Sequence, residues 1–189
     1  MKTGLLGMFG VMAITAACSG SGASFSGTIH GQSFSPQEAI SGTVTATDGS
    51  GNTTGYLLIA NRTGLCADAA GNKTPKSLAG FLILLNEYTG NADHTVSPSG
   101  AGTFVVSNGS SGKIAFAAFI SNDDSCQEIN AKSAAAASGT VTLTSASAGN
   151  YAGSYDLMLD SGDHVTGSFS SANCSAITTL GSSSTPTCF

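Results

Sequence analysis

Four cysteines in the body of the chain are the residues with the most definite chemistry. Thiols form disulfides in oxidising compartments, and they bind zinc where they lie in close pairs. The sequence contains no C-x-x-C or H-x-x-x-H pattern, so we expect no metal site of this kind. An even number of cysteines instead predicts two disulfides, for which three pairings are possible. We favour Cys66 with Cys126 and Cys174 with Cys188, since the second pair would pin the Ser/Thr-rich C-terminal tail.

Histidines and serines give no catalytic pattern. His30, His94 and His164 are far apart in the sequence, and the interpretation we favour is that each is an exposed strand or loop residue. Residues 109–112 (Gly-Ser-Ser-Gly) are one residue too short for the G-x-S-x-G motif of serine hydrolases, and no glycine-rich phosphate loop is present. We therefore expect no enzyme and no cofactor. A hydrolase of unfamiliar type would need a cleft that brings His164 or His94 beside a carboxylate or hydroxyl.

Carboxylates cluster in two places. Asp123 and Asp124 are adjacent, and Asp156, Asp160 and Asp163 fall within one expected hairpin. Calcium needs several converging oxygen ligands, but neither cluster follows the order of an EF-hand loop. The interpretation we favour is that these residues cap turns and keep the surface soluble.

The N-terminal segment has the three parts of an export signal. Lys2 supplies a positive start, residues 4–17 are uncharged and largely apolar, and small residues precede Cys18. As a helix with a rise of about 1.5 Å per residue, the uncharged run is too short to cross a hydrocarbon core of about 30 Å. We therefore expect a signal segment and not a permanent membrane span.

The end of this segment, Thr15-Ala16-Ala17-Cys18, resembles the lipobox of bacterial lipoproteins, although that family favours leucine where Thr15 stands. The resemblance implies that Cys18 is lipidated and becomes the mature N-terminus, so that the lipid bilayer is a partner. Ser19, by the same resemblance, implies sorting to an outer membrane where the cell has one. Plain secretion with cleavage nearby is the alternative.

Composition excludes some classes of partner. Charged residues make up 9% of the chain, and the 6 basic residues are outnumbered by 11 acidic ones, so nucleic acid is not expected as a partner. Abundant Gly, Ser and Thr suit short strands with hydroxyl-bearing outer faces.

Alternating and apolar runs predict strands. Residues 43–47 and 56–60 flank a dense turn, and the uninterrupted apolar run within residues 78–88 predicts the centre of the core. Residues 62–77 form an expected long loop with room for a helical turn. Three adjacent antiparallel strands follow from residues 138–169. Altogether we predict an all-β fold, an antiparallel β-sandwich or barrel-like domain of about eight to ten short strands.

Two N-terminal stretches are less definite. Residues 25–30 alternate and predict a first strand. Residues 35–38 (Ser-Pro-Gln-Glu) have the signature of a helix start, so we expect either one helical turn there or a strand from Ala39.

These elements divide the chain into a signal peptide at residues 1–17, a flexible tether at residues 18–24, and a single all-β domain at residues 25–189 with a Ser/Thr-rich C-terminal tail. The whole pattern is similar to small bacterial lipoproteins of uncharacterised function. That resemblance brings no active-site residues with it.

The expected function is that of a membrane-anchored extracytoplasmic lipoprotein with a non-enzymatic binding or scaffold role in the cell envelope, where an envelope protein or polysaccharide is the partner. The alternative is a sugar- or envelope-polymer-binding module. That alternative requires a groove lined with tyrosines, and the absence of Trp counts against it. The candidates are Tyr56, Tyr88, Tyr151 and Tyr155.

Metabolic labelling tests the anchor. We expect labelled palmitate to enter the parent chain and not the Cys18→Ala variant, because the thiol is the site of acylation. Equal labelling of the two proteins, or none in either, would refute lipidation at this residue.

Overall fold

The computed structural model describes residues 22–90, 94–179 and 187–189. The predicted signal segment and Cys18 lie outside the described residues. One sheet contains twelve strands: β1 (Gly22–Ala23), β2 (Ser26–Gly27), β3 (Glu38–Thr45), β4 (Thr53–Ala60), β6 (Ala79–Tyr88), β7 (Thr95–Val96), β8 (Gly102–Val106), β9 (Lys113–Ser121), β10 (Ala134–Ser147), β11 (Asn150–Leu159), β12 (His164–Ser170) and β13 (Ala172–Asn173). A second, two-stranded sheet contains β5 (Lys73–Thr74) and β14 (Thr187–Cys188). The helices are α1 (Leu65–Ala70), η1 (Asn130–Lys132) and η2 (Ser175–Thr179).

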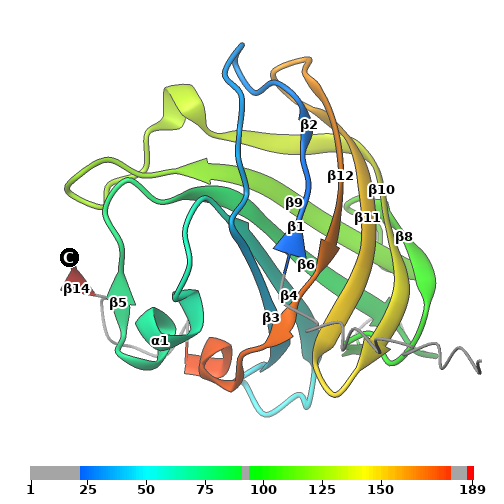
Figure 1. The fold of residues 1–189 in the computed structure, drawn as a ribbon. Helices are drawn as coiled ribbons and strands as arrows, with labels where there is room; N and C mark the ends of the chain where they lie inside the picture. The colour runs from blue at the N-terminus through cyan, green and yellow to red at the C-terminus, as the bar shows by residue number, and fades with distance from the viewer. Residues whose placement is uncertain (1–21, 91–93, 180–186) are drawn as a thin grey trace, which may run out of the picture.

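The main sheet confirms the all-β prediction and corrects its details. The strand order is β1-β12-β11-β10-β8-β9-β6-β4-β3-β13. Most neighbours are antiparallel, but β8 runs parallel to β9 and β13 parallel to β3, so the sheet is mixed. Figure 1 shows that the sheet curls until its two ends approach one another. A curled sheet hides one face and leaves the other outside.

Strand alternation decides which side chains enter the curl. On β11, Tyr155, Leu157 and Leu159 are buried, whereas Asp156 and Met158 point outward, as the alternation predicts. The predicted central strand is β6, which lies between β4 and β9. Its apolar run contributes to both faces of the sheet. Phe81, Ile83 and Leu85 are fully buried on the inner face. Leu82 and Leu84 are half-buried on the outer face.

Aromatic rings fill the inside of the curl. Phe34, Phe81 and Phe119 contact one another with ring centroids 5.2–6.0 Å apart, and Phe25 and Tyr155 extend the cluster. Edge-to-face packing of this kind adds about 0.5–1.5 kcal/mol per pair beyond the burial of area. The core is therefore built from residues that lie far apart in the sequence.

Of the two alternatives predicted for the segment after residue 34, the strand is confirmed. Residues 35–38 form no helical turn, and β3 begins at Glu38, one residue before the predicted start at Ala39. Within residues 25–30, where a first strand was predicted, strand structure is limited to β2. Pairing with β4 buries Ala39 and Ile40 completely or nearly so, and this burial outweighs the local helix signal.

The last residues of the predicted tether belong to the sheet. Gly22 and Ala23 pair with β12, and the Ser24 amide donates to the carbonyl of Ser168. The hydroxyl of Tyr155 also donates to the Ser24 carbonyl. A flexible tether therefore ends before residue 22.

A buried hydroxyl network closes the seam where β3 meets the turn between β10 and β11. The Ser41 hydroxyl donates to the carbonyl of Gly149 at 2.6 Å, and it contacts the Ser171 hydroxyl. Ser171 in turn accepts from the Tyr151 amide at 3.0 Å. Ser41 has no exposed surface and Ser171 has 7%, so this buried network adds side-chain hydrogen bonds to the short ladder that β13 makes with β3.

The seam network predicts a measurable loss of stability in Ser41→Ala. Removing this hydroxyl deprives the partly buried Gly149 carbonyl of its donor and the buried Ser171 hydroxyl of one partner, which lowers the free energy of unfolding by about 1–3 kcal/mol. Urea denaturation with both disulfides intact measures the effect. The control is Ser110→Ala in an exposed turn, expected within about 0.5 kcal/mol of the parent. Equal losses in the two variants would contradict the role of the seam.

Candidate binding site

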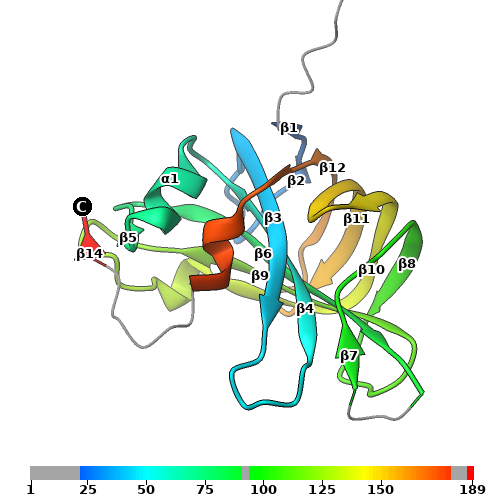
Figure 2. The ribbon, with the colours of Figure 1, turned by 90° about the horizontal axis from the view of Figure 1, so that it is seen from below.

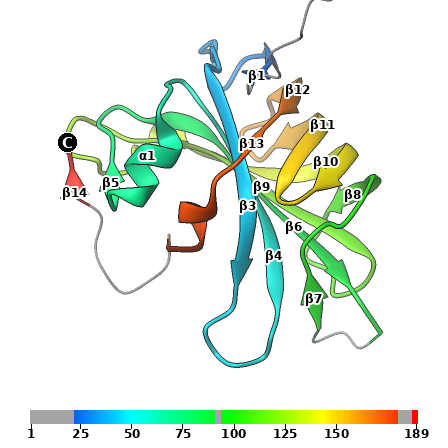
Figure 3. The ribbon, with the colours of Figure 1, turned by 60° about the horizontal axis from the view of Figure 1, so that its bottom comes forward.

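The two disulfides join segments that the sequence prediction did not pair. Cys66 on α1 bonds to Cys174 just before η2, with the Cα atoms 5.5 Å apart, and Cys126 bonds to Cys188 on β14. Two disulfides are confirmed, but the favoured pairings were wrong. The physical reason is the strand order, because β13 runs beside β3 and brings Cys174 to the side of the sheet on which α1 packs. Figures 2 and 3 show α1 and the orange helix after β13 side by side next to β3.

A second apolar cluster lies outside the curl, beneath these helices. It joins the outer face of β3 and β4 to α1 and η2, and it is separate from the core inside. Its buried members are Ile40, Ala60, Leu65, Ala69, Cys174 and Ile177. The helices therefore cover one part of an otherwise open outer face.

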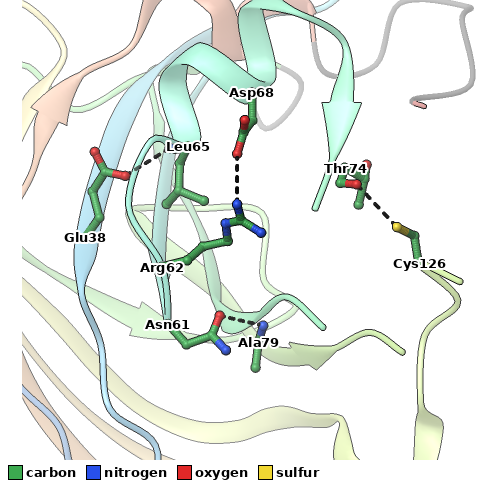
Figure 4. Close-up of polar contacts among 8 residues, drawn as sticks. All are labelled: Glu38, Asn61, Arg62, Leu65, Asp68, Thr74, Ala79 and Cys126. Atoms are coloured by element: carbon green, nitrogen blue, oxygen red, sulfur yellow. Dashed lines mark hydrogen bonds and ion pairs between the residues drawn. The ribbon is translucent and has the colours of Figure 1, made fainter. Parts of the chain in front are cut away.

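Polar contacts hold α1 and the segment after it in place (Figure 4). The Glu38 carboxylate on β3 accepts from the Leu65 amide at 3.0 Å, which satisfies an N–H at the start of α1. Asn61 accepts from the Ala79 amide at 3.0 Å, tying the two ends of the loop together. The Cys126 sulfur lies 3.2 Å from the Thr74 carbonyl oxygen, beside the parallel pairing of β5 with β14.

A pocket of about 190 Å³ lies between α1 with β5 and the outer face of the sheet. Its walls are mostly apolar and come from six elements, which are α1, β3, β4, β5, β6 and β9. They include Ile40, Leu58, Leu65, Ala69, Leu82 and Ile120. The two disulfides lie at its borders, one through α1 and one beside Thr74, so the pocket is formed before any ligand arrives.

Charged groups at the pocket are few and balanced. Asp68 lines it from α1, and Oδ2 of its carboxylate lies 4.0 Å from Nη2 of Arg62, beyond hydrogen-bonding distance. Lys73 lines the pocket from β5. Arg62 and Lys73 both lie over the ring of the C-terminal Phe189, at 5.5 Å from its centroid. Arg62 thus lies between the Asp68 carboxylate and the ring of Phe189, and Lys73 lies over the same ring.

Tyr56 supplies a phenol to the wall of the pocket. Burial raises the pKa of its hydroxyl to about 12. The hydroxyl therefore stays protonated at physiological pH and is a neutral group.

A larger and more polar hollow, of about 730 Å³, is lined by the segment between β2 and β3, by Phe119 and Ser121 of β9 and by η1. Phe34 and Phe119 contribute aromatic surface, while Gln32, Gln37 and Ser121 contribute amide and hydroxyl groups. Hollows at the ends of curled sheets are a common place for ligands.

The four tyrosines do not gather in one groove. Tyr151 and Tyr155 are buried within the curl, where desolvation raises the pKa of both hydroxyls. Tyr56 lines the apolar pocket, and Tyr88 is half-buried at the end of β6. These four residues therefore do not form a shared aromatic surface on which a sugar could stack.

One histidine does lie beside a carboxylate. Nε2 of His164 is 2.7 Å from Oδ1 of Asp156, but the two side chains are 55% and 66% exposed on the outer face of β11 and β12. Neither residue lines the two hollows described above. His94 is exposed, and Nε2 of His30 contacts the Ser133 carbonyl oxygen at 3.1 Å.

The carboxylate clusters cap turns. Oδ1 of Asp123 accepts from the amides of Ser125 and Gln127. Asp163 accepts from the Ser161 hydroxyl and the His30 amide, and these hydrogen bonds lower the pKa of its carboxyl. Within the described residues, no three potential metal ligands from His, Cys, Asp and Glu come together.

Comparison with known proteins gives no match, because no family model fits the chain and no curated protein or solved structure is significantly similar to it. Among the residues that the structure describes, no helix has the length and apolar character needed to cross a membrane.

Sequence reasoning missed the apolar pocket. One signal was available, because Leu65 and Ala69 are four residues apart and share one face of a helical turn. The rest of the wall comes from outer-face residues of strands, whose neighbours depend on the strand order.

The observed disulfides predict both a peptide map and a loss of stability. Digestion without reduction should yield peptides linking Cys66 to Cys174 and Cys126 to Cys188. Replacing Cys66 and Cys174 by serine should lower the free energy of unfolding by about 3–5 kcal/mol, since their separation of 108 residues makes a long closed loop. A peptide linking Cys66 to Cys126 would contradict the structure.

Proposed function

We propose that this chain is an exported, membrane-anchored, non-enzymatic binding protein that holds a small, largely apolar ligand between α1 and the outer face of its sheet. The observation that carries the proposal is the preformed apolar pocket bordered by both disulfides. Rigid pockets bind well because little conformational freedom is lost when the ligand enters.

The location rests on two kinds of support. Disulfides persist in oxidising compartments, so the two present here support a place outside the cytoplasm. The lipobox-like sequence before Cys18 supports a lipid anchor in the membrane, by resemblance the outer one where the cell has two. The strands begin only four residues after Cys18, so an anchored domain would lie close to the bilayer surface.

The lining of the pocket favours binding over catalysis. Neither histidine nor free cysteine is among the lining side chains, and the polar groups there are Asp68, Lys73, Thr74, Asn122 and the phenol of Tyr56. Apolar contact removes ligand surface from water, which stabilises the complex by about 25 cal/mol per Å². The loss of translational and rotational freedom on association offsets part of this gain. These walls therefore suit retention of a ligand.

A saccharide of the envelope is the second candidate ligand, at the larger and more polar hollow. Its support is the combination of planar amides from Gln32 and Gln37 with aromatic surface from Phe34, which matches the mixed polar and apolar faces of a sugar ring. The hollow replaces the tyrosine groove that the sequence suggested.

A titration with toluene, followed by NMR of the labelled full-length protein, tests the first proposal. We expect the largest amide shifts on α1, β4 and β6, and about tenfold weaker binding in Ile120→Phe, because the larger side chain occupies part of the pocket. Val105→Phe is the matched control, since Val105 is half exposed on β8 and does not line the pocket.

Two outcomes would count against the apolar pocket. Toluene shifts spread evenly over the chain, or equal affinities in the two phenylalanine variants, would contradict specific binding there. Shifts at Gln32 and Gln37 on titration with N-acetylglucosamine oligomers, without toluene shifts on α1, would favour the second candidate.

A further inference from the structure

The connection between β8 and β9 contains the one Asn-Gly pair of the sequence, Asn108-Gly109. Both residues are exposed, and residues 107–112 form neither strand nor helix. The carbonyl carbon of an asparagine side chain can be attacked by the backbone nitrogen of the next residue, which closes a five-membered ring. A glycine after the asparagine hinders this attack least, because it has no Cβ and a permissive backbone.

Few contacts restrain this pair. The Gly109 amide donates to the Ser107 hydroxyl at 3.0 Å, which is a local hydrogen bond within the turn. No side-chain hydrogen bond of Asn108 is found among the described residues. The side chain of Asn108 can therefore rotate toward the Gly109 nitrogen at the loss of one local hydrogen bond.

Comparable side chains elsewhere are held in place. The Asn61 side chain makes hydrogen bonds of 3.3 and 3.0 Å to backbone groups, and the Asn150 side chain makes two of 3.1 and 2.8 Å. Asp48-Gly49 has the same following glycine and is exposed. Hydrogen bonds from Ser50, however, lower the pKa of the Asp48 carboxyl, and an ionised carboxylate is a poor electrophile. The structure thus separates Asn108 from these positions.

We propose that Asn108 is a site of spontaneous deamidation in which water is the co-reactant. The Gly109 nitrogen loses its proton and bonds to Cγ of Asn108, while the bond from Cγ to Nδ2 breaks, so that ammonia leaves and a cyclic imide remains. Water then opens the imide. Opening at Cγ gives aspartate, and opening at the main-chain carbonyl carbon gives isoaspartate, through whose side chain the backbone continues. One water is consumed, one ammonia is released and one carboxyl is formed.

The new carboxyl would place a charge where the surface has none. Asn108 borders a hollow of about 460 Å³ together with Leu84 and Phe116, and no ionisable side chain lines that hollow. An aspartate carboxyl, whose ordinary pKa is about 3.9, is ionised at neutral pH. Deamidation therefore adds one negative charge to a chain of formal net charge −5 and gives a mostly apolar hollow an anionic border, which disfavours apolar contacts there.

Peptide mass spectrometry of the full-length protein, before and after incubation at mildly alkaline pH and physiological temperature, tests the proposal. We expect the peptide with Asn108 to exchange its amide for a carboxyl and to separate into aspartate and isoaspartate forms. In water enriched in heavy oxygen, one heavy oxygen should enter this peptide, because water opens the imide. The peptide with Asn130 is the internal control, since Asn130 is also exposed but precedes an alanine.

Two variants test the role of the glycine. Gly109→Ala should slow the conversion at least about tenfold, because the added Cβ hinders ring closure. The turn accepts this change, since the Cβ would meet the Ser107 hydroxyl oxygen at 3.2 Å, the movable end of a side chain. Ser110→Ala leaves the Asn-Gly pair intact and should convert at the rate of the parent.

Three results would overturn the proposal. They are an Asn108 that stays intact through the incubation, a conversion of Asn130 as fast as that of Asn108, and an unchanged rate in Gly109→Ala. The comparison of Asn108 with Asn130 is made within the parent protein, so it decides the question even if a variant does not fold.

Discussion

A sheet with one strongly apolar face has to hide that face, and this constraint organises the molecule. No helical layer is available to cover twelve strands, since the described helices have three to six residues. The sheet therefore curls and packs Tyr155 of β11 against Phe81 of β6, which lies beside Phe119 on the neighbouring strand β9. Curling leaves a seam, where the buried hydroxyls of Ser41 and Ser171 reinforce the short parallel pairing of β13 with β3.

The same curl turns the opposite face of the sheet outward, and this face is also apolar around β3, β4, β6 and β9. Helix α1 and η2 cover part of it, and the bond between Cys66 and Cys174 fastens them together. Their coverage is incomplete where Leu82 and Ile120 meet β5, and the gap is the pocket. The pocket thus arises from the mismatch between a wide apolar face and the short helices that cover it. Disulfides take the place of the larger helical interface that would otherwise hold such a cover.

Strand structure could be read from the sequence wherever one face alternates cleanly with the other. Residues 151–159 and 164–170 alternate between apolar and polar side chains, and both segments are strands with the expected inward residues. The helix signal at residues 35–38 was misleading, because burial of Ile40 against β4 exceeds the contribution of a local cap. Pairing of the cysteines was also beyond local reasoning, since it depends on which strands are neighbours.

The sequence by itself determined the all-β class, the number of disulfides and the central position of residues 79–88. It also carries the resemblance of the first 18 residues to a lipoprotein signal. All of these depend on residue type and on short spacing along the chain. Only the tertiary structure decided the parallel pairings, the disulfide partners and the pocket at Asp68 and Tyr56. The disulfide between Cys66 and Cys174 joins residues 108 apart in the sequence, and the pocket is lined by six separate elements. Contacts of this kind follow from strand order, which is set by how the whole apolar face is buried.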